Sequence, residues 1–150
     1  MPIITLPDGS KKMSKSDPNE GSRVNLLDTP EIITKKIKRA KSDSSIGIEF
    51  NNPDRAESKN LLMIYSILSG KEISQCENEF SETGWGTFKK LITEQLIESL
   101  EPIQEKYKVL INDPYQLNNI LKEGKEKAED LANKTLKRVK SKLGFFEMEK

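Results

Sequence analysis

The chain has 150 residues, of which 34% are hydrophobic and 33% charged, and its 25 basic and 24 acidic side chains leave a formal net charge of +1. This length suits one main domain, and the near balance of charge excludes an attraction to polyanions by the molecule as a whole. The absence of histidine excludes a histidine general base, a Cys-His nucleophile pair and histidine metal sites.

The single cysteine and the short apolar runs indicate the compartment in which the protein works. Cys76 has no partner for an internal disulfide, and a lone thiol among charged residues fits a reducing compartment. We interpret it as a packing residue. Residues 1–6 lack the basic flank and the apolar length of a signal peptide, and no run approaches membrane-spanning length. We therefore expect a cytoplasmic protein that does not associate with a membrane.

The first predicted element is a short strand. Residues 2–6, Pro-Ile-Ile-Thr-Leu, favour an extended conformation, which Pro7-Asp-Gly9 ends. A strand this short needs neighbours, and only residues 46–50 offer another alternating run. We therefore expect its sheet partners to lie outside this chain, which would make the chain a fragment. Loops are expected at residues 10–25 and 41–54.

From residue 28 onward the sequence predicts helices. Thr29 is an N-cap and Pro30 the first helical residue of the first one, and the second one ends at Gly70. Ser74 with Glu77 predicts a capping box for a short third helix. The apolar faces of these helices are formed by Ile33, Ile37 and Ala40, by Leu61, Ile64, Tyr65 and Leu68, and by Cys76 and Phe80.

Two longer helices complete the prediction. After a tight loop at residues 83–86, one apolar stripe runs over residues 88–110 through Pro102, so we expect one kinked helix. Asp113-Pro114 begins a last helix, whose apolar stripe continues to Gly144. The fold class that follows is mainly α, a helical bundle preceded by a remnant strand.

A loop rich in lysine and serine follows the predicted strand. Residues 10–18 read Ser-Lys-Lys-Met-Ser-Lys-Ser-Asp-Pro, a composition that disfavours regular structure. Lys11, Lys12 and Lys15 are thus carried on a loop, where ammonium groups can close over a polyphosphate and neutralise charge as pyrophosphate leaves. The alternatives are a solvated basic loop and a site for a kinase.

The spacing within this loop carries a resemblance. Lys12-Met-Ser-Lys-Ser16 reproduces the KMSKS signature of class I aminoacyl-tRNA synthetases, and the flanking segments resemble tryptophanyl-tRNA synthetase over essentially all 150 residues. Those segments are Asp17-Pro-Asn-Glu20, Asn25-Leu-Leu-Asp-Thr-Pro30, Ile37-Lys-Arg-Ala-Lys-Ser-Asp-Ser44, Asn60-Leu-Leu-Met-Ile-Tyr65, Gly84-Trp-Gly86 with Phe88-Lys89, Pro102-Ile-Gln-Glu-Lys-Tyr107, Gly124-Lys-Glu-Lys-Ala128 and Leu143-Gly-Phe145.

The resemblance implies an activity, its substrates and its residues. Enzymes of this family join tryptophan to ATP, supplied with magnesium, and pass the tryptophanyl group to a terminal ribose hydroxyl of tRNA(Trp). The resemblance implies that Lys12 and Lys15 are catalytic and contact the ATP phosphates, and that Met13, Ser14 and Ser16 shape the ATP-binding loop. Lys15 is the single residue that we favour most.

The resemblance also implies a division of the chain. Residues 1–27 would be the edge of an α/β Rossmann-type catalytic domain, bearing the remnant strand and the KMSKS loop, and residues 28–150 a helical domain on the anticodon side of the tRNA. The family's histidine-containing signature and its tryptophan pocket have no counterpart here, so we expect the isolated chain to be inactive. The full-length enzyme would be a homodimer, and no protein-bound metal is expected.

Two basic clusters are candidates for contact with RNA. Either cluster is also compatible with an ordinary solvated helix face. They comprise Lys35, Lys36, Lys38, Arg39 and Lys41, and Lys134, Lys137, Arg138, Lys140 and Lys142. Trp85 is interpreted as a buried loop anchor. The alternatives to a synthetase segment are an RNA-binding module without catalysis, part of a tyrosyl-tRNA synthetase, and a helical interaction protein.

Overall fold

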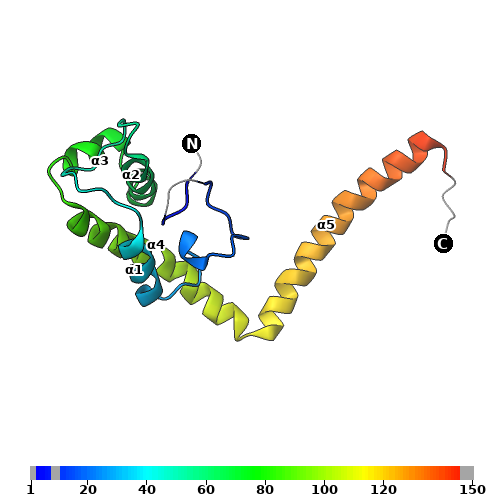
Figure 1. Ribbon diagram of the computed structural model, residues 1–150. Coiled ribbons are helices and arrows are strands. Elements are labelled where there is room, and N and C mark those ends of the chain that lie inside the picture. The colour runs from blue at the N-terminus through cyan, green and yellow to red at the C-terminus, as the bar shows by residue number, and fades with distance from the viewer. Residues whose placement is uncertain (1–2, 8–10, 146–150) are drawn as a thin grey trace. The chain divides into compact units, whose positions relative to one another are not determined.

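The structure, a computed structural model, describes residues 3–7 and 11–145. Its elements in chain order are a 3-10 turn η1 (Glu20–Ser22) and the helices α1 (Pro30–Arg39), α2 (Ala56–Ser69), α3 (Ile73–Glu79), α4 (Trp85–Ile111) and α5 (Pro114–Leu143), shown in Figure 1. The mainly α fold class is thus confirmed. The chain divides into two compact units, Met1–Glu105 and Lys106–Lys150; the predicted division between residues 27 and 28 stays a prediction.

The predicted strand at residues 2–6 is reduced to a single bridge in its described part. Ile4 and Lys12 form an isolated antiparallel β-bridge, and the amide of Met13 donates to the carbonyl of Ile3 at 2.8 Å. No strand occurs within residues 3–7 and 11–145, so nothing there extends this pairing into a sheet. The turn predicted after this strand lies largely outside the described residues.

The second alternating run, residues 46–50, is a loop held by other parts of the chain. The amide of Gly47 donates to Thr83 O at 3.1 Å and that of Ile48 to Phe80 O at 3.0 Å. Gly47 has φ +82°, and a Cβ atom there would lie 2.3 Å from the carbonyl oxygen of Ser81. Both facts require glycine. The alternation does not mark a strand: Ile48 is buried and Phe50 half-buried, but Ile46 is 75% exposed.

The ends of most helices follow the predicted caps. The hydroxyl of Thr29 accepts from the amide of Ile32 at the start of α1, and α2 ends at Gly70 with φ +70°. Asp113 caps α5 by accepting from Gln116 N at 3.0 Å. These predictions are confirmed because each cap is a local contact, which neighbouring residues alone determine.

Two details near α3 differ from the prediction. The capping box is formed by Glu72 and Gln75, whose side chain accepts from the Glu72 amide at 3.2 Å, and the predicted N-cap Ser74 lies inside the helix. The predicted box was therefore wrong by two positions, because a glutamate took the N-cap role that serine more often fills. Helix α4 then begins at Trp85, inside the predicted loop, and runs unbroken through Pro102.

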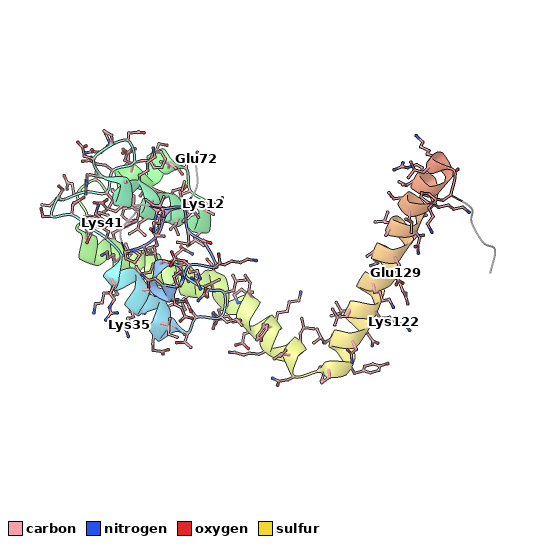
Figure 2. All side chains as sticks on the ribbon, turned by 45° about the vertical axis from the view of Figure 1, so that its right-hand side comes forward. Lys12, Lys35, Lys41, Glu72, Lys122 and Glu129 are labelled. Atoms are coloured by element: carbon pink, nitrogen blue, oxygen red, sulfur yellow. The ribbon has the colours of Figure 1, made fainter. Side chains whose placement is uncertain are left out.

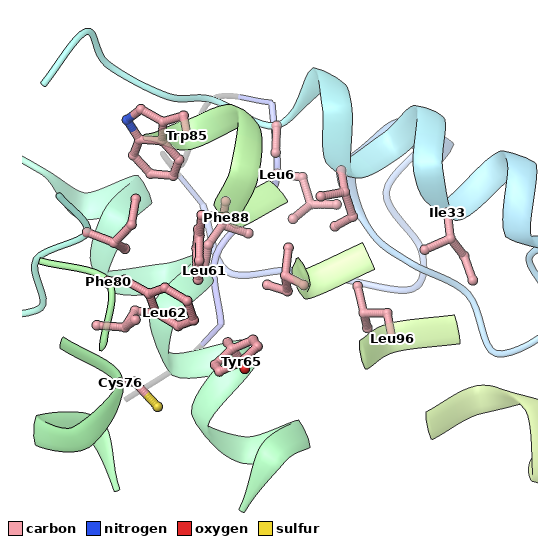
Figure 3. Close-up of a cluster of buried hydrophobic side chains, with 14 residues drawn as sticks. Leu6, Ile33, Leu61, Leu62, Tyr65, Cys76, Phe80, Trp85, Phe88 and Leu96 are labelled. Carbon is pink, nitrogen blue, oxygen red and sulfur yellow. The ribbon is translucent and has the colours of Figure 1, made fainter. Parts of the chain in front are cut away.

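The core of the first unit is aromatic at its centre (Figure 3). Phe80 lies between Tyr65 and Phe88, with ring centroids 5.0 and 4.9 Å away. Cys76 is fully buried beside them, which confirms it as a packing residue, and burial raises the pKa of its thiol. The cluster also contains Leu6, from the segment before the lysine-rich loop, and Leu96 from α4. This core joins the N-terminal segment to α1, α2, α3 and the first half of α4.

Helix α5, in the second unit, does not form part of a described core. None of its residues is buried, and Leu131 and Leu121 are 68% and 60% exposed. The predicted bundle is therefore limited to the first unit. An apolar stripe in the sequence indicates a helix face that can be buried, but it does not identify the element that packs against that face. Among the described helices, none combines the length and apolar character needed to cross a bilayer.

Candidate functional site

The residues with the predicted ATP-binding roles lie on one exposed turn, Lys12–Ser16, which we call the lysine loop. Lys12 and Lys15 have exposed side chains (Figure 2 labels Lys12), and no ion pair of either is found among the described residues. Met13 is half-buried and packs against the core. The methionine thus anchors a loop whose cations point into solvent.

The serines of the lysine loop shape it from within. The hydroxyls of Ser14 and Ser16 lie 3.0 Å apart, and the Ser16 amide donates to the Ser14 hydroxyl at 3.3 Å. The Asp17 amide donates to the Ser14 carbonyl, also at 3.3 Å. Such short-range bonds between hydroxyls and backbone are typical of serine in tight turns. Both hydroxyls lie at the surface, and because one of them donates to the other, the pair keeps one proton to donate to a phosphate oxygen.

Helix α2 holds the segment that enters the lysine loop. The side-chain amide of Asn60 accepts from Ile4 N at 2.9 Å and donates to Ile4 O at 3.2 Å. Farther along, the Lys41 amide donates to Leu6 O at 2.7 Å and the Leu6 amide to Ser22 O at 3.0 Å. The entry segment is therefore bonded to the rest of the first unit through the backbone groups of Ile4 and Leu6.

Two ammonium groups and two hydroxyls on an exposed turn can neutralise a polyphosphate. They cannot position a second reactant, which catalysis by such a loop requires. Among the described residues, no group of acidic or cysteine side chains is arranged to hold a metal ion.

The basic cluster on α1 is only partly free to bind a ligand. Lys35, Lys38 and Arg39 are exposed, whereas the Lys36 side chain is 10% exposed and its Nζ lies 2.5 Å from Asp28 Oδ2. Burial alone raises the pKa of Asp28, but hydrogen bonds from Lys36 and from the Asn25 backbone lower it more, and the net shift is downward. Lys36 therefore has a structural ion pair.

The cluster on α5 is exposed throughout. Lys134 pairs with Asp130 one helical turn earlier, at 2.7 Å, and Lys137 and Arg138 also face solvent. An exposed pair of this kind holds its partners weakly. The cluster is thus an exposed cationic surface on α5.

Trp85 is a buried anchor, as predicted. Its indole Nε1 donates to Asp43 Oδ1 at 3.0 Å, and the other carboxylate oxygen accepts from Arg55 Nε at 2.7 Å. The guanidinium of Arg55 also donates to the Gly47 carbonyl at 2.8 Å. These contacts, led by the bond from Arg55 and opposed by burial, lower the pKa of Asp43 to about 2. Sequence patterns gave no signal for this group, because its members are far apart in the chain.

A groove of about 700 Å³ lies between α1 and α4 in the first unit, beside Trp85. Lys89, on its wall, donates to Ala40 O at 2.6 Å and to Ser42 Oγ at 3.1 Å, and burial lowers the pKa of its ammonium group. Those contacts stabilise the carboxyl end of α1, where backbone carbonyls attract a cation. The exposed Lys38 lines the same groove.

Comparison with known proteins places this geometry in a family. The sequence profile described as "tRNA synthetases class I (W and Y)" matches residues 1–101. A tryptophan-tRNA ligase of Prochlorococcus marinus subsp. pastoris is 77% identical over 148 residues, which are 99% of this chain and 44% of that protein. A chloroplastic/mitochondrial tryptophan-tRNA ligase of Arabidopsis thaliana is 45% identical over 97% of this chain and 36% of its own length.

A solved structure agrees in fold as well as sequence. The tryptophanyl-tRNA synthetase of Mycoplasma pneumoniae superposes with a TM-score of 0.84 at 30% identity, over 97% of this chain and 46% of that one. The chain thus spans less than half the length of the curated relatives that it matches. With its KMSKS turn inside the matched region, the chain belongs to the class I tRNA synthetases of the tryptophan and tyrosine group.

Proposed function

We propose that this chain is the part of a tryptophan-tRNA ligase that carries the ATP loop and the helical region following the catalytic domain. One observation carries the proposal: an exposed KMSKS turn with two exposed lysines lies in a chain that is 77% identical, over 99% of its length, to a tryptophan-tRNA ligase. The family profile includes tyrosine enzymes, and the identity to named tryptophan enzymes favours the tryptophan substrate.

The proposed reaction has two steps. The tryptophan carboxylate forms a bond to the α-phosphorus of ATP, and the bond to pyrophosphate breaks. The tryptophanyl group then moves to a terminal ribose hydroxyl of tRNA(Trp), releasing AMP. In the first step Lys12 and Lys15 neutralise charge on the departing pyrophosphate, the hydroxyl pair of Ser14 and Ser16 donates to a phosphate oxygen, and Met13 fixes the loop on the core. Magnesium enters with the ATP.

We assign residues 1–27 to the edge of the catalytic domain and residues 28–150 to the anticodon side. In this proposal the exposed cations of α1 and α5 track tRNA phosphates, because clustered lysines release counterions from a nucleic acid. The candidates are Lys35, Lys36, Lys38 and Arg39, and Lys134, Lys137 and Arg138. Lys36 ranks below the others because its ion pair with Asp28 already compensates its charge.

Assembly and compartment belong to the whole protein. We propose a homodimer for the full-length enzyme, and a cytoplasmic location. The plant relative is named as chloroplastic/mitochondrial, so an organellar location is the alternative.

Tryptophan-dependent ATP–pyrophosphate exchange tests the proposal. In the full-length protein we expect Lys15→Ala to lower the exchange rate by about 100-fold or more, because preorganised charge stabilisation at a leaving group contributes on that scale. Lys71→Ala, which removes an exposed lysine far along the chain from the loop, is the matched control and should exchange like wild type. The isolated chain should not exchange at all.

Two results would contradict the proposal. Full-length protein that shows no tryptophan-dependent exchange, yet binds tRNA, would favour an RNA-binding module. Exchange that depends on tyrosine would move the chain to the tyrosine enzymes.

A further inference from the structure

A chain of hydrogen bonds begins where the lysine loop ends. Arg23 Nη1 donates to the backbone carbonyl of Asp17 at 2.8 Å, and Asp17 directly follows Ser16, the last residue of the loop. The turn η1 brings Arg23 back to this position, since Asn19 accepts from the amides of Gly21 and Ser22. Arg23 therefore bonds the exit of the loop to the turn that follows it.

The orientation of Arg23 depends on its neighbours. Its Nε donates to Asn25 Oδ1 at 2.9 Å, and the backbone amide of Asn25 donates to Asp28 Oδ2 at 2.8 Å. Asp28 is 7% exposed and is bonded to Lys36 of α1. A buried carboxylate with two donors holds a fixed position. Asp28 therefore fixes Asn25, and Asn25 fixes the orientation of the Arg23 guanidinium.

Helix α4 also bonds to the segment around Asp28. Gln104 Nε2 donates to Leu26 O at 2.9 Å and to Asp28 O at 3.0 Å. The exit of the lysine loop is thereby linked to α1 and α4, as Asn60 links its entry to α2.

We propose that Arg23 is a positioning residue for ATP: held by Asn25 and Asp28, it fixes the Asp17 carbonyl and so sets the conformation from which Lys15 meets the phosphates. The inference rests on the proposed function. A loop rich in serine and lysine loses conformational entropy when it closes on a ligand, and a bond that orders it beforehand reduces that loss. In this role Arg23 contacts no substrate atom and acts only through the conformation of the loop.

The first test measures Michaelis constants in the full-length protein. We expect Arg23→Ala to raise the KM for ATP in pyrophosphate exchange by about tenfold, equivalent to about 1.4 kcal/mol, with the KM for tryptophan nearly unchanged. Asn25→Ala, which keeps the charge of Arg23 and its bond to Asp17 O but removes the acceptor of its Nε, should produce a smaller rise in the same constant. Arg23→Lys should recover part of the loss, because one ammonium group can reach Asp17 O or Asn25 but lacks the fork that joins them.

A matched control separates positioning from stability. Arg55→Ala removes a buried arginine that bonds to Asp43 and Gly47; it should lower the melting temperature and leave the KM for ATP unchanged. If Arg23→Ala behaves in this way too, its role is only structural and the inference is overturned. If Arg23→Ala does not fold, Asn25→Ala decides by the same criterion.

A second measurement does not depend on activity. Endoproteinase Lys-C cleaves after lysine and ignores residue 23, so its cleavage rate at Lys12 and Lys15 reports the order of the loop in both wild type and Arg23→Ala. We expect cleavage there to be several-fold faster in the variant and equal to wild type in Arg55→Ala under native conditions. Equal rates in wild type and Arg23→Ala would overturn the inference. Wild-type protein without exchange activity would refute the proposed function alone, and the cleavage rates would still test the positioning role.

Discussion

Asp43 shows how much a single residue of the first unit connects. Its carboxylate receives the indole of Trp85 and the guanidinium of Arg55, and through Arg55 it is joined to the carbonyl of Gly47. A loop, the start of α2 and the start of α4 thus meet at one acidic group. Its pKa, lowered to about 2 from an ordinary value of 3.8, means that folding favours the ionised form.

The stability of the first unit should therefore depend on pH through Asp43. A lowered pKa stabilises the fold above the unfolded value and loses that contribution as pH falls from about 4 to about 2, by about 2 kcal/mol in total. We expect Asp43→Asn to lower the urea midpoint at pH 7 and to flatten its decline over that range. Fluorescence of the single tryptophan measures both. Asp54→Asn, which changes an exposed carboxylate, is the control, and its urea midpoint should depend on pH as that of the wild type does.

At the scale of elements, Asn60 has a role that its position in the sequence conceals. It lies on the buried side of α2, 5% exposed, where an apolar residue would continue the core. Its amide instead pairs with both backbone groups of Ile4, much as a neighbouring strand would. The helix therefore takes the place of a pairing strand, which the N-terminal segment lacks within residues 3–7 and 11–145.

Replacing Asn60 should release the entry segment of the lysine loop. Asn60→Ala leaves the amide of the half-buried Ile4 without its acceptor, which costs about 1 kcal/mol, and we expect faster hydrogen exchange at Ile4 and at Met13, whose amide bonds to Ile3. Exchange within the core of α4 should be little changed. Protection of Ile4 equal to that of wild type would mean that the clamp contributes nothing to local order.

Contacts within one element could be predicted from the sequence, whereas contacts between elements could not. The caps at Thr29 and Asp113 were predictable because their bonds span three residues. Asn60 and Arg23 were missed because they bond to backbone carbonyls or amides, which every residue carries, and so leave no pattern of spacing. The roles of Lys12 and Lys15 came from a signature and remain predictions, since the structure shows their exposure but no ligand.

At the scale of the whole molecule, the two units differ in kind. The first has a continuous core that includes its N-terminal segment and ends with Leu100, and the second exposes its apolar residues on α5. Sequence periodicity could not distinguish these cases, since both helices α4 and α5 carry apolar stripes. Only the first unit shows how the chain buries its own surface.

The first unit should consequently unfold independently of α5. Removing residues 114–150 deletes no member of the core cluster, so we expect the urea midpoint measured by Trp85 fluorescence to change by no more than the equivalent of about 0.5 kcal/mol. A truncation after Gln95, which also removes Leu96 and Leu100, should abolish cooperative unfolding. A large loss from the first truncation would show that α5 stabilises the first unit.

The clamps at both ends of the lysine loop have a consequence for building chimaeras. Asn60 and Arg23 attach the loop to the helices of the first unit, and Gln104 reaches back to Leu26 across the predicted boundary after residue 27. A graft joined at that boundary would pair a loop from one parent with clamps from another. A graft joined ahead of Ile3 would transplant loop and clamps together, so the lysine loop is inherited most safely as a part of the helical region.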